Sequence, residues 1–396
     1  MGKGKRVEGD RAWEDRLIAI RRQLHQYPEL SNEEYATTQA IRRWLEEAGI
    51  RILPYALRTG LIAEVGGRGS GPVVALRADI DALPIQEESG LPYASAHPGK
   101  MHACGHDYHT AALLGAAFAL KEREAELAGA VRLIFQPAEE KATGAQQVIA
   151  SGALVGVSAI FGLHNKPDLP VGTVGIKSGP LMAAADGFAI EVDGIGSHAA
   201  VPDAALDPIV TAAHIVTALQ SVISRNVSPL DSAVISVTRI HSGTSWNVIP
   251  DKAVMDGTLR TFDERVRTRV RRRLEEVVGG VAAAYGTTAS VRWIQGPPAV
   301  HNDTELAELG REAAKRSGLE VVEPPPYTAG EDFAYYQREV PGLFVFLGTA
   351  GTQEWHHPAF TLDERALAPS AAYLAQLAGD ALDQLAAGQT SIAARS

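Results

Sequence analysis

Residues 102–109, with the sequence HACGHDYH, place one thiol and three imidazoles in a short segment. Cys104 is the only cysteine of the 396-residue chain, so it cannot form an internal disulfide. Thiolate and imidazole are both ligand types of zinc and related metals. A single cysteine can also act as a small buried apolar side chain. The segment therefore predicts either a metal ligand or a buried hydrophobic residue at position 104.

Three apolar segments, predicted as β-strands, end just before further candidate ligands. The segments are RLIFQ at 132–136, AIFG at 159–162 and LFVFLG at 343–348. The side chains that follow them are Glu139 and Glu140, His164, and His356 with His357. In an open α/β sheet, functional groups gather beyond the carboxyl ends of the strands. If the three strands are neighbours, these residues converge with Cys104 and His106 on one crevice.

This set of thiol, imidazole and carboxylate groups is too large for one tetrahedral metal. It suits two divalent ions about 3.5–4 Å apart that share a bridging ligand. A thiolate between two cations would be fully deprotonated. Of two adjacent glutamates, one can bind metal while the other accepts a proton from water. The mixed donor set admits Zn, Mn, Co or Ni. A hydrolase that uses Cys104 and a nearby histidine without metal is the alternative at this point.

The elements that must position these residues can be predicted from the hydrophobic pattern. The first part of the chain predicts helices, with a capping box formed by Ser31 and Glu34 and a helix end at Gly49. Two short strands follow at 60–65 and 72–80, joined by GGRGSG. This glycine-rich link lacks the Walker spacing and the dinucleotide fingerprint, so it predicts a hairpin turn and no phosphate loop.

Strands alternate with helices through about residue 183, which indicates βα units and a mainly parallel sheet. Residues 184–298 instead follow the order β-α-β-β-α-β, which is typical of a ferredoxin-like module. The earlier pattern resumes at 299. We therefore expect an α/β domain, with helices flanking the sheet, built from 1–183 and 299–396. A smaller ferredoxin-like α+β domain, 184–298, is inserted into it.

The composition excludes several classes of protein. Apolar residues make up 45% of the chain and charged residues 21%, as in ordinary globular proteins. A formal net charge of −10 argues against a general nucleic-acid binder. No apolar run approaches the roughly 18–20 residues that span a bilayer, so no membrane partner is expected. The start, MGKGKRVEGD, lacks the apolar core of a signal peptide. With one cysteine, this predicts a cytoplasmic protein.

Motifs along nearly the whole chain resemble one known family. They are LHQYPELS, LRADIDALPI, HACGHDYHTAALLG, FQPAEE, GLHN, GSHAAVP, NVIPD, GTLRTFD, GEDFA and HHPAFTLDE. They are similar to the dinuclear metallo-amidohydrolases that include hippurate hydrolases, N-acyl-amino-acid amidohydrolases and plant auxin-conjugate hydrolases. These form a branch of the aminoacylase and carboxypeptidase family. The resemblance implies an enzyme with two divalent metal ions.

The resemblance also implies roles for the residues of the crevice. Cys104 would bridge the metals, with His106 and His164 completing one site. Glu140 and a C-terminal histidine would complete the other, and Glu139 would act as general base and then general acid. The family motif has a small polar residue between the histidine and the proline, which aligns the ligand with His356 and leaves His357 in the polar position.

For the inserted domain, the resemblance implies a lid that also mediates dimerisation, giving a homodimer or a higher homo-oligomer. His198 would polarise the scissile carbonyl, Asn247 would assist, and Arg260 would pair with a substrate carboxylate. Neutral donors suit a developing oxyanion, and a guanidinium suits a carboxylate. The chain departs from the family at Asp203, where a histidine is common, and in TSWN before the asparagine.

Four side chains near the motifs have no single predicted role. Asp81 either orients an imidazole ligand or caps a turn. His102, Asp107 and His109 either support the ligands or are structural. The implied reaction is hydrolysis of a small N-acyl-L-amino acid to a carboxylate and a free amino acid. A dipeptidase or carboxypeptidase of the same architecture is the alternative, and a non-catalytic binding protein is the least consistent, because no ligand or base is missing.

Overall fold

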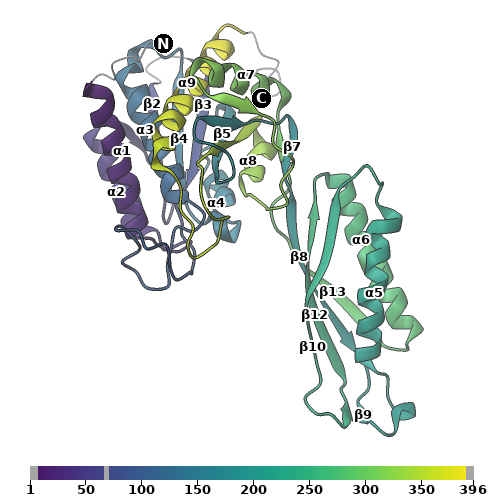
Figure 1. Cartoon of the computed structure of the whole chain (residues 1–396). Helices are drawn as coiled ribbons and strands as arrows, with labels where there is room; N and C mark the ends of the chain where they lie inside the picture. The colour runs from purple at the N-terminus through teal and green to yellow at the C-terminus, as the bar shows by residue number, and fades with distance from the viewer. Residues whose placement is uncertain (1–7, 67–70, 389–396) are drawn as a thin grey trace. The chain divides into compact units, whose positions relative to one another are not determined.

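The computed structural model describes residues 8–66 and 71–388, with the side chains of 8–11 left out. The chain forms two compact units (Figure 1). Unit 1 comprises 1–179, 301–325 and 332–396, and unit 2 comprises 180–300 and 326–331. The absence of a signal peptide was predicted from residues 1–10, and the first seven of these lie outside the described part. No helix of the described residues is long and apolar enough to cross a membrane.

The described part of unit 1 is built on an eight-stranded sheet of order β1-β2-β4-β3-β5-β16-β6-β15. The strands are β1 (Arg51–Leu53), β2 (Leu61–Gly66), β3 (Val73–Asp79), β4 (Ala130–Gln136), β5 (Val157–Lys166), β6 (Thr173–Gly175), β15 (Glu320–Val322) and β16 (Gly342–Gly348). The four central strands, β4-β3-β5-β16, are mutually parallel. Their carboxyl ends therefore meet at one edge, which confirms the predicted mainly parallel sheet.

The predicted hairpin between β2 and β3 is wrong. β4 lies between them, paired antiparallel with β2 through Leu61 and Phe135 and parallel with β3 through Leu76 and Leu133. Every residue of β4 is buried, so the sheet gains more by placing this apolar strand inside than by pairing neighbours in sequence. Residues 67–70 of the link lie outside the described residues.

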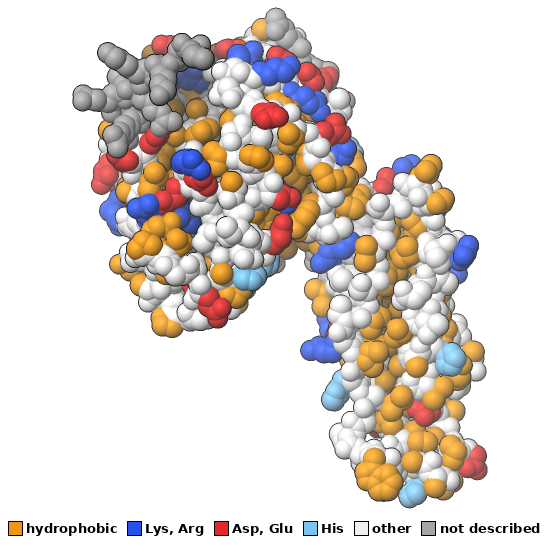
Figure 2. Space-filling model, in the orientation of Figure 1, with side chains coloured by type: hydrophobic (Ala, Val, Ile, Leu, Met, Phe, Trp, Pro, Cys, Tyr) orange, Lys and Arg blue, Asp and Glu red, His pale blue; other side chains and the backbone are white. Residues whose placement is uncertain are grey.

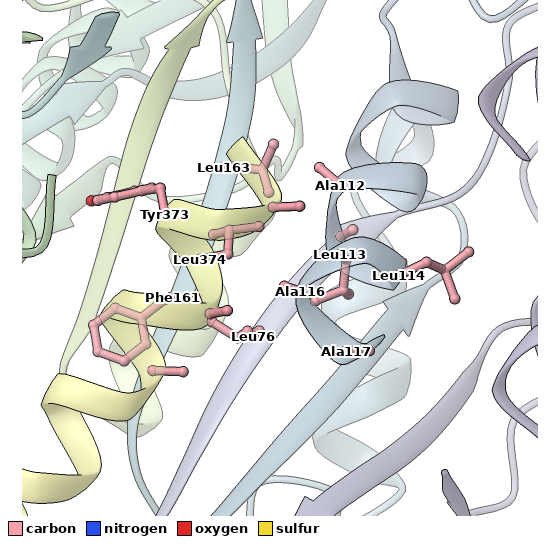
Figure 3. Close-up of a cluster of buried hydrophobic side chains, with 14 of the residues drawn as sticks. Leu76, Ala112, Leu113, Leu114, Ala116, Ala117, Phe161, Leu163, Tyr373 and Leu374 are labelled. Atoms are coloured by element: carbon pink, nitrogen blue, oxygen red, sulfur yellow. The ribbon is translucent and has the colours of Figure 1, made fainter. Parts of the chain in front are cut away.

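Helices cover the faces of this sheet. They are α1 (Glu8–Gln26), α2 (Tyr35–Glu47), α3 (His106–Glu122), α4 (Gly144–Ala150), α7 (Thr304–Arg316), α8 (Phe333–Glu339) and α9 (Leu367–Ala386), with short 3₁₀ turns η1 (Glu124–Glu126), η2 (Glu139–Lys141) and η4 (Glu364–Ala366). Side chains of α3, α9 and the central strands form one apolar core, in which Leu113, Leu374 and Leu76 lie close together (Figure 3). At Gly115, a Cβ would approach the Ala371 Cβ to 2.7 Å. The helix that begins with His106 is therefore firmly anchored.

The predicted capping box before α2 is also wrong. Ser31 Oγ donates to Asp81 Oδ2 at 2.6 Å, and the Glu34 carboxylate accepts from the backbone N–H of Ala138 at 2.9 Å. The free N–H groups of the first turn of α2 are satisfied instead by the carboxylate of Glu29. The two polar residues of the box are therefore committed to loops distant in sequence. The helix end at Gly49, with φ of +67°, is confirmed.

Unit 2 contains an antiparallel sheet of order β10-β12-β8-β13 with α5 and α6 on one face (Figure 1). Its elements are β8 (Ala184–Asp193), η3 (Pro202–Ala204), α5 (Pro208–Asn226), β10 (Ala233–Ser242), β12 (Lys252–Thr261), α6 (Glu264–Ala284) and β13 (Thr288–Ile294). This is the predicted β-α-β-β-α-β order with ferredoxin-like strand pairing. The short strands β9 (Ser197–His198) and β11 (Val248–Ile249) form a separate pair, and β7 (Gly179–Met182) and β14 (Val300–Asn302) lie where the chain passes between the units.

A buried ion pair joins the sheet of unit 2 to α6. The Nε and Nη2 atoms of Arg267 donate to the two carboxylate oxygens of Asp186, at 2.7 and 2.6 Å. Both side chains are at most 2% exposed. The backbone N–H of Gly296 also donates to Asp186. Both oxygens of this buried carboxylate are thus paired with donors.

We predict that Arg267→Met lowers the free energy of unfolding by about 3–5 kcal/mol, because it leaves the Asp186 charge buried without its partner. Urea denaturation followed by circular dichroism measures this change. Lys252→Met, which removes an equally short but exposed pair with Glu191, is the matched control and should change the unfolding free energy little. Equal effects of the two substitutions would contradict the prediction.

Candidate active site

The carboxyl edge of the parallel strands brings six predicted site residues together. Their ligand atoms form overlapping groups in which all atoms lie within 4.8 Å of one another, and the members are Cys104, His106, Glu139, Glu140, His164 and His356. Glu139 and Glu140 follow β4, and His356 lies in the loop after β16. His164 lies inside β5 and not after it, because pairing with β16 continues to the last residue of the strand.

Cys104 belongs to two of these groups. One contains His106 and His164, and the other contains Glu140 and His356. The thiol Sγ lies 3.5 Å from His164 Nε2, and Glu140 Oε1 lies 3.5 Å from His356 Nε2. Cys104 is 6% exposed. A thiol shared between two sets of donors has the position that a ligand common to two ions requires.

Two atoms of this cluster are buried without a hydrogen-bond partner among the described residues. They are His106 Nε2 and Glu140 Oε1, which lie 3.8 Å apart. Leaving a buried polar atom unsatisfied costs about 1–3 kcal/mol, so such atoms are rare in folded proteins unless something else occupies them. A divalent cation would satisfy both. The donors present therefore fit a metal centre.

The surroundings of His106 favour positive charge. Burial lowers the pKa of its imidazole, but the carboxylates of Asp79, Asp81 and Glu140 raise it to about 10 overall. Its Nδ1 lies 3.3 Å from Asp81 Oδ1, which directs Nε2 into the cluster. The same carboxylates that hold a proton on the ring would attract a cation at Nε2.

His164 has the opposite character. Burial, with the neighbouring His109, holds the pKa of its imidazole well below the ordinary value, so the ring is neutral. Nδ1 donates to the backbone oxygen of Asn165 at 2.9 Å, which leaves the lone pair of Nε2 facing Cys104. Neutral imidazole with a fixed tautomer is the form that binds metal ions.

Asp81 connects the loops that carry these groups. Four donors of the described residues reach its carboxylate: Ser31 Oγ at 2.6 Å, His106 Nδ1 at 3.3 Å, and the backbone N–H groups of Glu139 and Glu140 at 3.1 Å each. Burial opposes its ionisation, but the hydrogen bonds from His106 and Ser31 lower its pKa. Asp81 thus has the first of the two roles open from the sequence, since it orients an imidazole. The turn it holds is the one after β4, and not the turn that follows Asp81 in the chain.

The tandem histidines 356 and 357 differ in what their rings contact. His356 adopts a left-handed backbone with φ of +66°, and its N–H donates to the oxygen of Ala103 at 2.8 Å. This brings its ring to Glu140. His357 Nδ1 instead accepts the N–H of Ala359 at 3.0 Å within its own turn. The geometry therefore favours His356 in the cluster.

His109 has both ring nitrogens engaged away from the cluster. Nδ1 donates to Asp79 Oδ1 at 2.6 Å, and Nε2 accepts the backbone N–H of Asn165 at 2.9 Å. Neither nitrogen is left for a metal. His102 is 2% exposed, and burial lowers its pKa to about 4, so it is a neutral buried ring. Of the three imidazoles in the segment, only His106 lies in a group of potential metal ligands with Cys104, although both ring nitrogens of His102 also have no hydrogen-bond partner among the described residues.

Asp107 belongs to a second buried network behind α3. Its carboxylate accepts from Arg21 Nε at 2.7 Å and from His25 Nδ1 at 2.9 Å. Although burial opposes ionisation, these two groups hold the pKa of Asp107 far below its ordinary range. Asp107 therefore anchors α1 to the first turn of α3.

A group of buried polar residues beneath the cluster was not predicted to belong to the site. Arg77 of β3 donates to Asp79 at 2.8 Å and to Asp332 at 2.8 Å, and Asp332 also accepts from Gln136 and the N–H of Ala145. The signal in the sequence was a charged residue within an apolar strand, together with the GEDFA motif. A charge in a central strand must be paired to be tolerated.

The predicted residues of the inserted domain lie in unit 2. His198 and Asn247 are brought together by the β9–β11 pair, where the Ala199 N–H donates to the backbone oxygen of Asn247 at 3.1 Å. The Ala200 N–H donates to His198 Nδ1 at 3.1 Å, so a neutral His198 carries its proton on Nε2. Ser245 Oγ donates to Asn247 Oδ1 at 2.7 Å.

Arg260 is not brought to this pair within unit 2. It lies eight residues along β12 from Lys252, about 26 Å at the usual rise per residue. The end of unit 2 that carries β9 exposes apolar and histidine side chains (Figure 2), among them Trp246, which is 93% exposed. Asp203 lies exposed in η3.

The chain is similar to known hydrolases and peptidases over most of its length. Residues 75–380 match peptidase family M20/M25/M40. The chain is 55% identical over 370 residues to an N-acetyl-L-cysteine deacetylase of Bacillus subtilis (strain 168), covering 93% of this chain and 89% of the relative. It is 40% identical over 376 residues to the IAA-amino acid hydrolase ILR1-like 4 of Arabidopsis thaliana, covering 92% and 85%. A dinuclear metal-binding peptidase of the M20 family from Bacillus subtilis has a similar structure, with a TM-score of 0.86, 52% identity and coverage of 94% and 99%.

We predict that Asp81→Ala lowers the free energy of unfolding of the metal-free protein by about 2–4 kcal/mol, because several donors lose their acceptor at once. Urea denaturation in the presence of a chelator measures the change. Ser31→Ala, which removes one donor from the same carboxylate, should cost about 1 kcal/mol. An Asp81→Ala protein as stable as Ser31→Ala would show that Asp81 does not hold the loops together.

Proposed function

The chain belongs to peptidase family M20/M25/M40, and from this premise we propose that it hydrolyses the amide bond of N-acyl-L-amino acids at a centre of two divalent metal ions. The observation that carries the proposal is Cys104, shared by two groups of donors, with buried and unpartnered atoms on His106 and Glu140. The names of the deacetylase and of the plant amino-acid-conjugate hydrolase support the substrate class.

The metal ligands we propose are Cys104 as the shared ligand, His106 and His164 for one ion, and Glu140 and His356 for the other. The donor set contains sulfur, nitrogen and oxygen and admits Zn, Mn, Co or Ni. When bound, the ions would supply Lewis acidity toward the amide carbonyl and make water easier to deprotonate. The carboxylates around His106 balance the positive charge.

Glu139 is the proposed general base and acid. Its backbone is held by Asp81, and its Oε1 accepts the N–H of Asp332 at 3.3 Å. The turn η2 is bracketed by Ala138 and Ala142, both with positive φ of about +50°. This strained backbone directs the two adjacent glutamates differently. Glu139 takes the proton of the attacking water and returns it to the leaving nitrogen, so that a carboxylate and a free amino acid form.

The proposed substrate contacts of unit 2 are His198, Asn247 and Arg260. With Nδ1 engaged, a neutral His198 donates through Nε2, which suits an amide oxygen that gains negative charge. Ser245 occupies the Asn247 oxygen, so the amide nitrogen of Asn247 is left to donate. The guanidinium of Arg260 would pair with the carboxylate of the amino acid. Because Arg260 lies about 26 Å along β12 from the end that carries His198 and Asn247, these contacts to one small substrate would come from two different chains. In this proposal residues 184–298 act as a lid and in dimerisation.

We further infer a cytoplasmic homodimer or larger homo-oligomer. Cys104 is a free thiol, and cytoplasmic thiols are kept reduced. Strand β10 is at the edge of its sheet and exposes Val234 and Ile240, at 43% and 55%. An exposed apolar edge strand can pair with the same strand of a second chain.

Two alternatives are less well supported. A dipeptidase or carboxypeptidase of the same architecture would use the same centre and differ only in its substrate contacts. In a metal-free cysteine hydrolase a nearby histidine such as His164 would accept the proton of Cys104, but burial and the neighbouring His109 lower the pKa of His164, which weakens it as a base. Such a hydrolase would also leave Glu140 without a role.

We expect the purified protein, stripped of metal with a chelator and reconstituted with Zn, Mn, Co or Ni, to hydrolyse N-acetyl, N-benzoyl or indole-acetyl amino acids. Dipeptides and C-terminally extended peptides in the same assay test the peptidase alternative. Release of the free amino acid is measured by chromatography. Full activity after chelation would exclude the metal mechanism, and cleavage of dipeptides alone would exclude the acyl-amino-acid substrate.

We predict that Glu139→Gln lowers kcat by at least about 10²-fold, because glutamine cannot accept the proton of water. The metal content should stay at the wild-type value, since Glu139 is not a proposed ligand. Steady-state kinetics and elemental analysis of the same samples measure both quantities. Turnover near that of the wild type would refute the assignment of the base.

A further inference from the structure

Asn165 is in contact with two loops of the candidate metal centre. It is the next-to-last residue of β5, follows His164, and is 0% exposed. Its side-chain amide contacts one loop that carries Cys104 and another that leads to His356. We infer that Asn165 is a positioning residue whose amide fixes these two loops relative to each other. The inference rests on the metal centre of the proposed function.

The first contact is with the loop of Cys104. Asn165 Nδ2 donates to the backbone oxygen of Cys104 at 2.6 Å. The next residue, Gly105, has φ of +84°, and a Cβ there would lie 2.4 Å from Asn165 Nδ2. The loop therefore packs directly against the amide, and only glycine fits at that position.

The second contact is with the loop after β16. Asn165 Oδ1 accepts the indole Nε1–H of Trp355 at 3.1 Å. The indole also packs against the imidazole of His164, with ring centroids 4.1 Å apart. Trp355 directly precedes His356. The amide of Asn165 therefore connects the loop of Cys104 with the loop of His356, and through the indole it is also linked to the ring of His164.

The amide makes both contacts because it carries a donor and an acceptor on separate atoms. The Cys104 oxygen requires a donor, and the Trp355 indole requires an acceptor. Aspartate keeps the acceptor but loses the donor, and an apolar residue loses both. The side-chain Nδ2 also lies 3.0 Å from His109 Nε2 and 3.5 Å from His164 Nδ1. The backbone N–H and oxygen of Asn165 contact the same two rings, and these backbone contacts persist when the side chain changes.

The test is the affinity of the metal-free protein for zinc, measured by competition with a chromophoric chelator. We expect Asn165→Asp to bind zinc about 10–100-fold more weakly, the usual effect of losing a residue that orients ligands. A carboxylate oxygen would then face the Cys104 oxygen. Trp355→Phe keeps the aromatic ring but removes the indole donor, so it should weaken binding less. The double variant should lose less zinc-binding free energy than the two single variants lose in sum, because both substitutions interrupt the contacts that run from Cys104 through Asn165 to Trp355.

Asn302 provides a matched control in unit 1. It is also buried, at 1% exposed, and its Nδ2 donates to the backbone oxygens of Lys177 at 2.9 Å and Phe344 at 2.8 Å. Asn302→Asp should lower the thermal midpoint without changing the affinity for zinc. The positioning role is overturned if Asn165→Asp binds zinc as tightly as the wild type, or if Asn302→Asp weakens binding equally.

Two further outcomes separate this inference from the proposed function. A wild-type protein that binds no zinc would overturn the metal centre itself, and the inference with it. If Asn165→Asp does not fold, Trp355→Phe decides, because unchanged zinc affinity in that variant overturns the connection between the loops.

Discussion

The buried carboxylate of Asp81 is the interaction on which the arrangement of the site depends most directly. A charge removed from water is stable only if protein donors replace its hydration. Here the donors come from the loop before α2, from α3 and from the turn after β4, three segments far apart in sequence. Satisfying one charge therefore fixes the positions of a proposed ligand and of the proposed base together.

The same requirement extends beneath the sheet edge. Asp79 is held ionised in the interior by His106, His109 and Arg77, although burial opposes it, and Arg77 in turn reaches Asp332. His109 in turn accepts a hydrogen bond from the backbone N–H of Asn165. Among the described residues, His106 Nε2 and Glu140 Oε1 at this sheet edge have no hydrogen-bond partner, and neither has either ring nitrogen of His102. Of these atoms, only the first two lie together in a group of potential metal ligands.

Much of this could be predicted from the sequence because it depends on patterns longer than one contact. Apolar strands alternating with helices specify a mainly parallel sheet, and parallel strands bring residues at their carboxyl ends to one edge. The capping box and the hairpin failed for one reason: both rules are local. Ser31 and Glu34 serve distant loops, and β4 enters between two strands adjacent in sequence.

The three histidines of residues 102–109 show why the remaining part could not be predicted. Burial is the main cause that lowers the pKa of His102 to about 4. For His106, the carboxylates of Asp79, Asp81 and Glu140 outweigh burial and raise the pKa to about 10. His109 is occupied on both sides by Asp79 and Asn165. Identical side chains within eight residues thus differ because other strands supply their neighbours. The chemistry of the segment is therefore a property of the assembled sheet edge.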